Sequence, residues 1–140
     1  TRSTTVTGVQ TCALPIFKID LFGQVNAESM AGRQISGPGG QLDFVIGAII
    51  RETGRVLFAS LRLIAISTGG FIPKRADIAA GIDVTDTRTA VHYVVTEYGK
   101  AKLKGLSPWE RAKALISISY PDFLEELVRA AEKFGVWRKR

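Results

Sequence analysis

The sequence contains very few of the residues that disulfides and metal sites require. Among its 140 residues there is one cysteine, Cys12, and one histidine, His92. A single cysteine cannot close a disulfide within the chain, and Cys12 has no histidine or cysteine partners at metal-ligand spacing. We therefore expect no metal site.

Long apolar runs and nucleotide-binding fingerprints are also lacking. The longest apolar stretches, 44–50 and 56–66, end at or are broken by an arginine, and both are shorter than the roughly 18 residues of a membrane-spanning helix. Neither GxGxxG nor GxxxxGK[ST] occurs, which disfavours nucleotide hydrolysis. The first residues do not have the pattern of a signal peptide. We expect no membrane association and a cytoplasmic location.

The composition is typical of a globular domain with a basic surface. Hydrophobic residues make up 46% of the chain and charged residues 23%, and 19 Lys and Arg against 13 Asp and Glu give a net charge of +6. The basic residues are scattered apart from the tail 138–140, and no segment interleaves them with aromatic residues. The net positive charge is compatible with an anionic ligand, and we do not expect nucleic acid to be a partner.

The first sixteen residues differ in character from the rest. Residues 1–16 are rich in threonine, almost uncharged and without helical or alternating periodicity. Residues 6–16 also resemble the in-frame translation of a sequencing-library adapter. We predict that residues 1–16 are not native and that residues 17–140 form one domain.

Hydrophobic spacing predicts helices alternating with strands. A helix is expected over 42–53 with Gly54 as its cap. Its predicted apolar face consists of Leu42, Val45, Ile46, Ile49 and Ile50. Residues 55–67 and 91–96 are typical of buried strands. This alternation predicts an α/β fold, a mostly parallel sheet flanked by helices.

Two further helices are expected near the C-terminus. Ser107-Pro108-Trp109-Glu110 has Ser at the N-cap, Pro at the first helical position and Glu three residues after the Ser, which predicts a capping box and a helix to about residue 118. Pro121 opens a second helix that ends at Gly135. Its predicted apolar face is Phe123, Leu127, Val128 and Ala131.

A glycine-rich segment is the best local candidate for chemistry. Residues 16–21 alternate loosely as a short strand, and residues 23–40 are too polar and small for a packed element, so we expect a long loop there. The loop ends in SGPGG, Ser36–Gly40, directly before the first predicted helix. Glycines let a backbone approach a ligand, and a helix start offers N–H donors, so the segment suits a phosphate, a carboxylate or an oxyanion. An ordinary turn would fit the pattern as well.

Each of two titratable residues, Glu97 and His92, has both a structural and a functional interpretation. Glu97 follows the predicted strand 91–96, at the position where open α/β sheets place their ligand crevices, but it also suits a solvated loop. His92 lies within that strand between apolar neighbours, which favours a structural histidine over a general base.

Six segments together resemble a known family. They are GQVNAES (23–29), SGPGGQLDF (36–44), VHYVVTEYG (91–99), LKG (103–105), ERAKALI (110–116) and PDF (121–123). In order and spacing they resemble the C-terminal domain of the acetyl-CoA hydrolase/transferase family, particularly its 4-hydroxybutyrate and butyrate CoA-transferase-like members. The resemblance covers nearly all of residues 17–134.

The resemblance implies a CoA-transferase-like C-terminal domain, here incomplete, and an activity. Family members move CoA from an acyl-CoA to a free carboxylic acid through a glutamyl-CoA thioester. Coenzyme A is then the cosubstrate, and acyl-CoA and small carboxylic acids are the partners. The full-length parent is compatible with a homo-oligomer, but the sequence does not determine its oligomeric state. The matching positions make Gly39 and Gly40 oxyanion donors, Asn26 and Gly37 CoA contacts, and Glu97 a residue that positions the substrate.

The family's nucleophilic glutamate belongs to a segment upstream of anything that resembles Phe17. We therefore expect the chain to be a fragment that is inactive alone, although its full-length parent would be an enzyme. Asp86-Thr87 stands where the family usually has Thr-Pro. The alternatives are an acyl-CoA hydrolase, a non-catalytic module that binds CoA or another anion, and a fragment that folds poorly.

Overall fold

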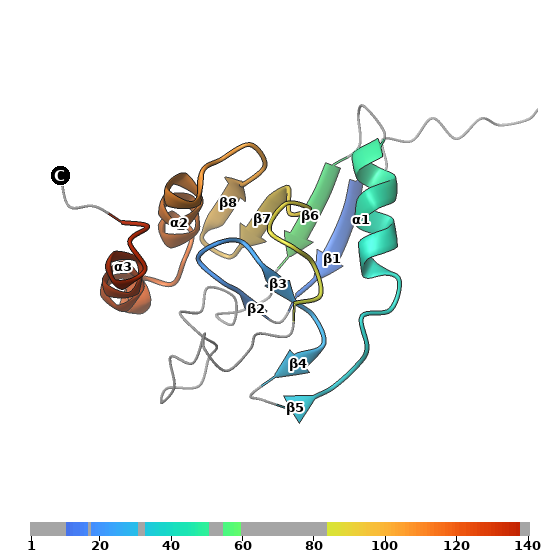
Figure 1. The fold of residues 1–140 in the computed structure, drawn as a ribbon, viewed down its shortest axis with the longest axis horizontal. Helices are drawn as coiled ribbons and strands as arrows, with labels where there is room; N and C mark the ends of the chain where they lie inside the picture. The colour runs from blue at the N-terminus through green and yellow to red at the C-terminus, as the bar shows by residue number, and fades with distance from the viewer. Residues whose placement is uncertain (1–10, 17, 31–32, 51–54, 60–83, 138–140) are drawn as a thin grey trace, which may run out of the picture.

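The computed structural model describes residues 11–16, 18–30, 33–50, 55–59 and 84–137, which are built around a four-stranded sheet (Figure 1). The strands lie in the order β1 (Thr11–Pro15), β6 (Arg55–Ala59), β7 (Tyr93–Thr96) and β8 (Gly99–Lys102). The first three are parallel, and β8 runs antiparallel to β7. The predicted mostly parallel sheet is confirmed. Of the strand predicted over 55–67, residues 60–67 lie outside the described ranges.

Helix α1 (Gln41–Ile50) connects two neighbouring parallel strands and packs against both of them, β1 and β6. A crossover helix runs antiparallel to the strands that it connects, so its N-terminus lies at the edge of the sheet where the parallel strands end. Figure 1 shows the Gln41 end of α1 at the same edge as the arrowheads of β1 and β6. The glycines before α1 are therefore placed at this edge.

The buried face of α1 differs from the prediction. Val45 is fully buried and Ala48 nearly so, whereas Leu42, Ile46 and Ile50 are exposed. Seven of the ten residues in QLDFVIGAII are apolar aliphatic or aromatic, and apolar side chains on most sides of a helix leave spacing unable to choose one face. The predicted end at 53 lies outside the described residues.

Two short ribbons precede α1. Strand β2 (Lys18–Ile19) pairs with β3 (Val25–Asn26), and β4 (Ser29–Met30) pairs with β5 (Arg33–Gln34), both antiparallel. The expectation that 23–40 holds no packed element is wrong at β3, because Val25 and Asn26 are buried. Two-residue strands carry no periodicity from which they could be predicted.

The C-terminal helices follow the prediction closely. Helix α2 (Pro108–Ser117) begins with the full capping box between Ser107 and Glu110. A 3₁₀ turn, η2 (Pro121–Phe123), leads into α3 (Leu124–Lys133), and Gly135 follows with φ of +70°. Of the predicted face, Leu127 and Ala131 are buried and Phe123 and Val128 pack beside them.

The core has two parts that share α2. The larger part packs one face of the sheet against α1 and α2, and its fully buried members include Val45, Val56, Phe58, Val94 and Leu115. The smaller part joins α2 to α3 through Ala112, Ile116, Leu127 and Ala131. Within the described ranges no helix is long and apolar enough to span a membrane.

Candidate functional site

Three loops converge at the N-terminus of α1. Val25 and Asp86 exchange two backbone hydrogen bonds, of 3.0 and 3.1 Å. The Thr85 hydroxyl accepts from the Ala27 N–H at 2.9 Å and donates to a carboxylate oxygen of Glu28 at 2.9 Å. The segments 25–28 and 84–86, far apart in sequence, are thus fastened together below the helix.

The glycine loop, Ser36–Gly40, is anchored at both ends to these segments. At its start, the Ser36 N–H donates to the Glu28 carbonyl at 3.0 Å and the Ser36 hydroxyl to the Ala27 carbonyl at 3.3 Å. Just past its end, Gln41 Nε2 donates to Asp86 Oδ2 at 2.6 Å. The loop is therefore fixed by side-chain contacts on either side of the glycines.

Between these anchors the glycines are open to solvent. A Cβ atom added at Gly37 or Gly39 would meet no heavy atom within 4 Å, and Gly39 has φ of +53°, a conformation that favours glycine. The Gly40 carbonyl accepts the first helical hydrogen bond, from the Phe44 N–H at 3.1 Å. The earlier N–H groups of a helix have no partner within it, so this end of α1 presents donors and a positive dipole to an anion.

Asn26 lies beside the glycine loop, but its side chain is used inside its own turn. Asn26 Oδ1 accepts from the N–H groups of Glu28 and Ser29, both at 2.9 Å, and Nδ2 donates to the Ser29 hydroxyl at 2.8 Å. Asn26 is almost fully buried. In the structure the Asn26 side chain therefore stabilises the turn formed by residues 26–29. Its contact with CoA stays a prediction.

Glu97 lies at the same edge of the sheet but apart from the glycine loop. It occupies the two-residue turn between β7 and β8 and is exposed. Its carboxylate makes no hydrogen bond or ion pair with any residue that the structure describes. Helix α1 packs against β1 and β6, whereas Glu97 follows β7, the next strand of the sheet. The position suits a residue that meets a ligand from the side, and its role stays a prediction.

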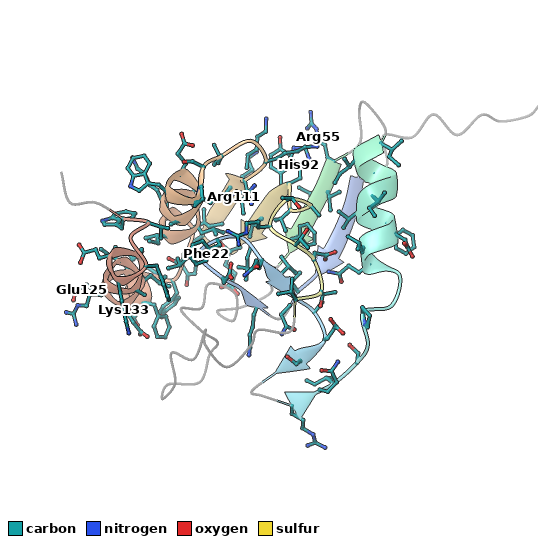
Figure 2. The ribbon with its side chains drawn as sticks, viewed as in Figure 1. Phe22, Arg55, His92, Arg111, Glu125 and Lys133 are labelled. Carbon is teal, nitrogen blue, oxygen red and sulfur yellow. The ribbon has the colours of Figure 1, made fainter. Side chains whose placement is uncertain are left out.

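His92 lies at the opposite edge of the sheet. It precedes β7, and Figure 2 shows it next to Arg55, the first residue of β6. Burial, and then the positive charges of Lys104, Lys102 and Arg55, lower the pKa of His92 below its usual 6.5. Because it stands at the amino ends of the strands, it is not placed to serve as a base at the glycine loop.

Sequence reasoning missed the two residues that anchor the helix end, Gln41 and Asp86. Asp86 has no exposed surface, and its Oδ1 atom is buried without a hydrogen-bond partner. Burial raises the pKa of Asp86, against the opposite effect of the Gln41 hydrogen bond. Gln41 follows Gly40 directly and could have been suspected. Asp86 stands out in the sequence only as a departure from the family's usual Thr-Pro, which does not indicate an anchor. In the described part of the chain no three His, Cys, Asp or Glu residues form a group that could hold a metal ion.

Comparison with known proteins identifies the family. A sequence profile of the acetyl-CoA hydrolase/transferase C-terminal domain matches residues 6–131. The chain belongs to this family. It is 48% identical over 123 residues to butyryl-CoA:acetate CoA-transferase of Anaerostipes caccae, covering 86% of this chain and 27% of that protein. It is 42% identical over 116 residues to 4-hydroxybutyrate coenzyme A transferase of Clostridium kluyveri, covering 83% and 27%. The chain thus spans about a quarter of the length of these relatives.

Solved structures confirm the fold class. RipA from Yersinia pestis superposes with a TM-score of 0.69 and 34% identity, over 89% of this chain and 26% of that one. The 4-hydroxybutyrate CoA-transferase from Porphyromonas gingivalis gives a TM-score of 0.58 and 26% identity, over 87% of this chain and 26% of that one.

The family match begins at residue 6, within the segment that we expect to be non-native. The origin of residues 1–16 stays a prediction.

Proposed function

We propose that this chain is part of a CoA-transferase that moves CoA between an acyl-CoA and a free carboxylic acid. The observation that carries the proposal is the exposed glycine loop, anchored at both ends, at the N-terminus of α1. It is supported by the similarity to CoA-transferases named for butyryl-CoA and 4-hydroxybutyrate. Coenzyme A is then a cosubstrate, and the parent protein acts in the cytoplasm as a homo-oligomer, without nucleic acid or membrane partners.

The glycine loop would act on the first chemical step. A glutamate carboxylate attacks the thioester carbonyl carbon, and the carbonyl oxygen becomes an oxyanion that the N–H groups of Gly39 and Gly40 stabilise. The C–S bond then breaks, which leaves an acyl-glutamyl anhydride and the CoA thiolate. One oxyanion donor is worth about 2.7–4 kcal/mol of activation free energy. This term is the largest that the described residues would supply.

The remaining steps return CoA to a new acid. The thiolate attacks the glutamyl carbonyl, releases the first carboxylate and leaves a glutamyl-CoA thioester. An acceptor carboxylate attacks this thioester, and the CoA thiolate finally takes the acyl group from the resulting anhydride. We assign the attacking glutamate to a segment outside this chain. Neither Glu97 nor Glu28, whose carboxylate accepts from Thr85, is proposed for that role.

The other site residues would hold the substrates. The turn shaped by Asn26 lies beside the glycine loop, and the open space around Gly37 leaves room for the pantetheine arm to pass. Glu97 would orient the carboxylic acid through a bridging water, since two bare carboxylates in direct contact repel.

Hydrolysis is the second candidate, because the chain is also 30% identical over 119 residues to acetyl-CoA hydrolase of Candida albicans. In that reaction water, rather than an acid, takes the acyl group. The two activities differ in their dependence on the acceptor.

The test is CoA exchange by the protein encoded by the complete reading frame. With butyryl-CoA as donor, a transferase forms acetyl-CoA only when acetate is added, whereas a hydrolase forms free CoA without it. Neither product, over a panel of short acyl-CoA donors and acids, would contradict both candidates. The 140-residue chain alone is the control and is expected to be inactive.

A further inference from the structure

A buried acid holds the first residue of α1, just after the glycine loop. Asp86 has no exposed surface, and its Oδ2 atom accepts a 2.6 Å hydrogen bond from Gln41 Nε2. Gln41 is the first residue of the helix. Among the described residues, no other side chain bonds to the Asp86 carboxyl group.

The backbone that carries Asp86 is itself fixed on both sides. On one side it bridges to Val25 in β3. On the other side Arg111, buried in α2, donates to the carbonyls of Leu106, at 3.1 Å, and of Arg88. Figure 2 shows the Arg111 side chain extending from α2 toward this region. Asp86 is thus a rigid support for whatever its side chain holds.

We propose that Asp86 and Gln41 are positioning residues that fix the direction of the N–H groups of Gly39 and Gly40. The proposal rests on the proposed function, because the oxyanion is what those groups would meet. Ser36 fixes the start of the glycine loop and the Gln41–Asp86 bond its end, while the glycines between them have open space around them. Without the second anchor the loop and the first turn of α1 could rotate away from the reacting carbonyl.

The surroundings indicate that Asp86 performs this role as a neutral acid. Its Oδ1 atom is buried without a partner, and a bare carboxylate there would lose its hydration without compensation. Asp43 in α1 and Glu28 would repel a second negative charge. The remaining charged groups of the elements around Asp86 are exposed Arg88, Arg111 in α2, and Lys18 and Asp20 beside β3. Only Gln41 bonds to the Asp86 carboxyl group among the described residues. An uncharged Asp86 leaves the positive end of α1 to the ligand.

Neutrality makes asparagine a faithful replacement. Asp86→Asn keeps the size of the side chain and an oxygen that can accept from Gln41, whereas Asp86→Ala removes the acceptor. Gln41→Met removes the donor from the other side at nearly constant volume. Thr89→Ala, a change of an exposed residue in the same loop, is the matched control.

The first measurement is kinetic and uses the enzyme from the complete reading frame. We expect Asp86→Ala and Gln41→Met to lower kcat by about 10- to 100-fold with little change in KM for acyl-CoA, since misplaced catalytic groups cost about that much. Asp86→Asn is expected to restore kcat to within about threefold of the wild type. Equal kcat in all variants, or an Asp86→Asn enzyme as poor as Asp86→Ala, would overturn the proposal.

The second measurement does not depend on activity. In the ¹⁵N-labelled 140-residue chain, the amide resonances of Gly39 and Gly40 should shift in Asp86→Ala and Gln41→Met but stay in place in Asp86→Asn and Thr89→Ala. Unshifted glycine amides in the first two variants would refute the anchor. Shifted amides together with a wild-type enzyme that transfers no CoA would refute the proposed function instead.

Discussion

At the residue scale, two groups whose pKa is shifted mainly by burial lie at opposite edges of the sheet. Asp86 stands below the glycine loop and is perturbed mainly by burial. His92 stands at the amino ends of the strands and is perturbed by burial and by three basic neighbours. Burial therefore raises the pKa of an acid at one edge of the sheet and lowers the pKa of a base at the other.

Stability should depend on pH through Asp86. Because the pKa of the folded state lies above the ordinary 3.8, the folded protein favours the protonated form. The stabilisation is complete below pH 3.8 and is lost as the pH rises through the folded-state pKa. The free energy of unfolding of the wild type, measured with urea, should therefore fall relative to that of Asp86→Asn as the pH rises above about 4. A pH-independent difference between the two proteins would show that Asp86 does not titrate abnormally.

The basic neighbours of His92 can be tested one charge at a time. Lys102→Gln and Lys104→Gln should each raise the pKa of His92, because each removes a positive charge that disfavours the imidazolium. The pKa is followed by NMR of the ring protons. Added salt should have the same effect in the wild type, through screening. Lys113→Gln, on α2, is the control, and an equal rise in that variant would refute the assignment.

At the element scale, α2 depends on its capping box. Ser107→Ala removes the hydroxyl that accepts from the Glu110 N–H and should lower the free energy of unfolding by about 0.5–2 kcal/mol. Ser117→Ala, near the end of the same helix, loses a bond only to the Ala114 carbonyl. It should cost less than Ser107→Ala, and the reverse order in urea unfolding would contradict the assigned cap.

Helix α1 offers a matched pair of neighbouring apolar residues. Val45 is 0% exposed and Ile46 is 46% exposed. Val45→Ala should cost about 1.5–3 kcal/mol of stability because it removes buried methyl groups and leaves a cavity. Ile46→Ala should change stability by less than about 0.5 kcal/mol, as for other surface positions. Equal losses of stability in the two variants would mean that α1 buries Ile46 as well as Val45, as the sequence predicts.

The features that the sequence predicts correctly are those whose interacting residues lie close together in the chain. The Ser107–Glu110 cap lies within four residues and was predicted in full. The face of α1 was predicted only in part: Val45 is buried and Ile49 packs against the core, but the other three predicted residues are exposed. Its apolar side chains do not define a single stripe. The packed strand β3 and the Asp86–Gln41 bond escaped prediction, since contacts 45 residues apart in sequence depend on the tertiary fold. The glycine loop was found early because its signal, glycines before a helix, is local.

At the scale of the whole molecule, the chain spans 27% of the length of the Anaerostipes caccae relative. The origin of residues 1–16 can be settled at the DNA level. Genomic sequence around the Phe17 codon is expected to show a continuous coding sequence upstream that differs from TRSTTVTGVQTCALPI. Recovery of that same sixteen-residue sequence in genomic DNA would show that the segment is native.

The central claim is that the glycine loop stabilises the oxyanion of CoA transfer, and one pair of variants tests it most directly. Gly39→Val forces a β-branched residue to φ of +53°, whereas Gly47→Val changes a glycine within α1 that also has open space around it. In the enzyme from the complete reading frame, Gly39→Val should lower kcat for CoA exchange by about 10²- to 10³-fold, and Gly47→Val should leave it nearly unchanged. Full activity in Gly39→Val would contradict the account.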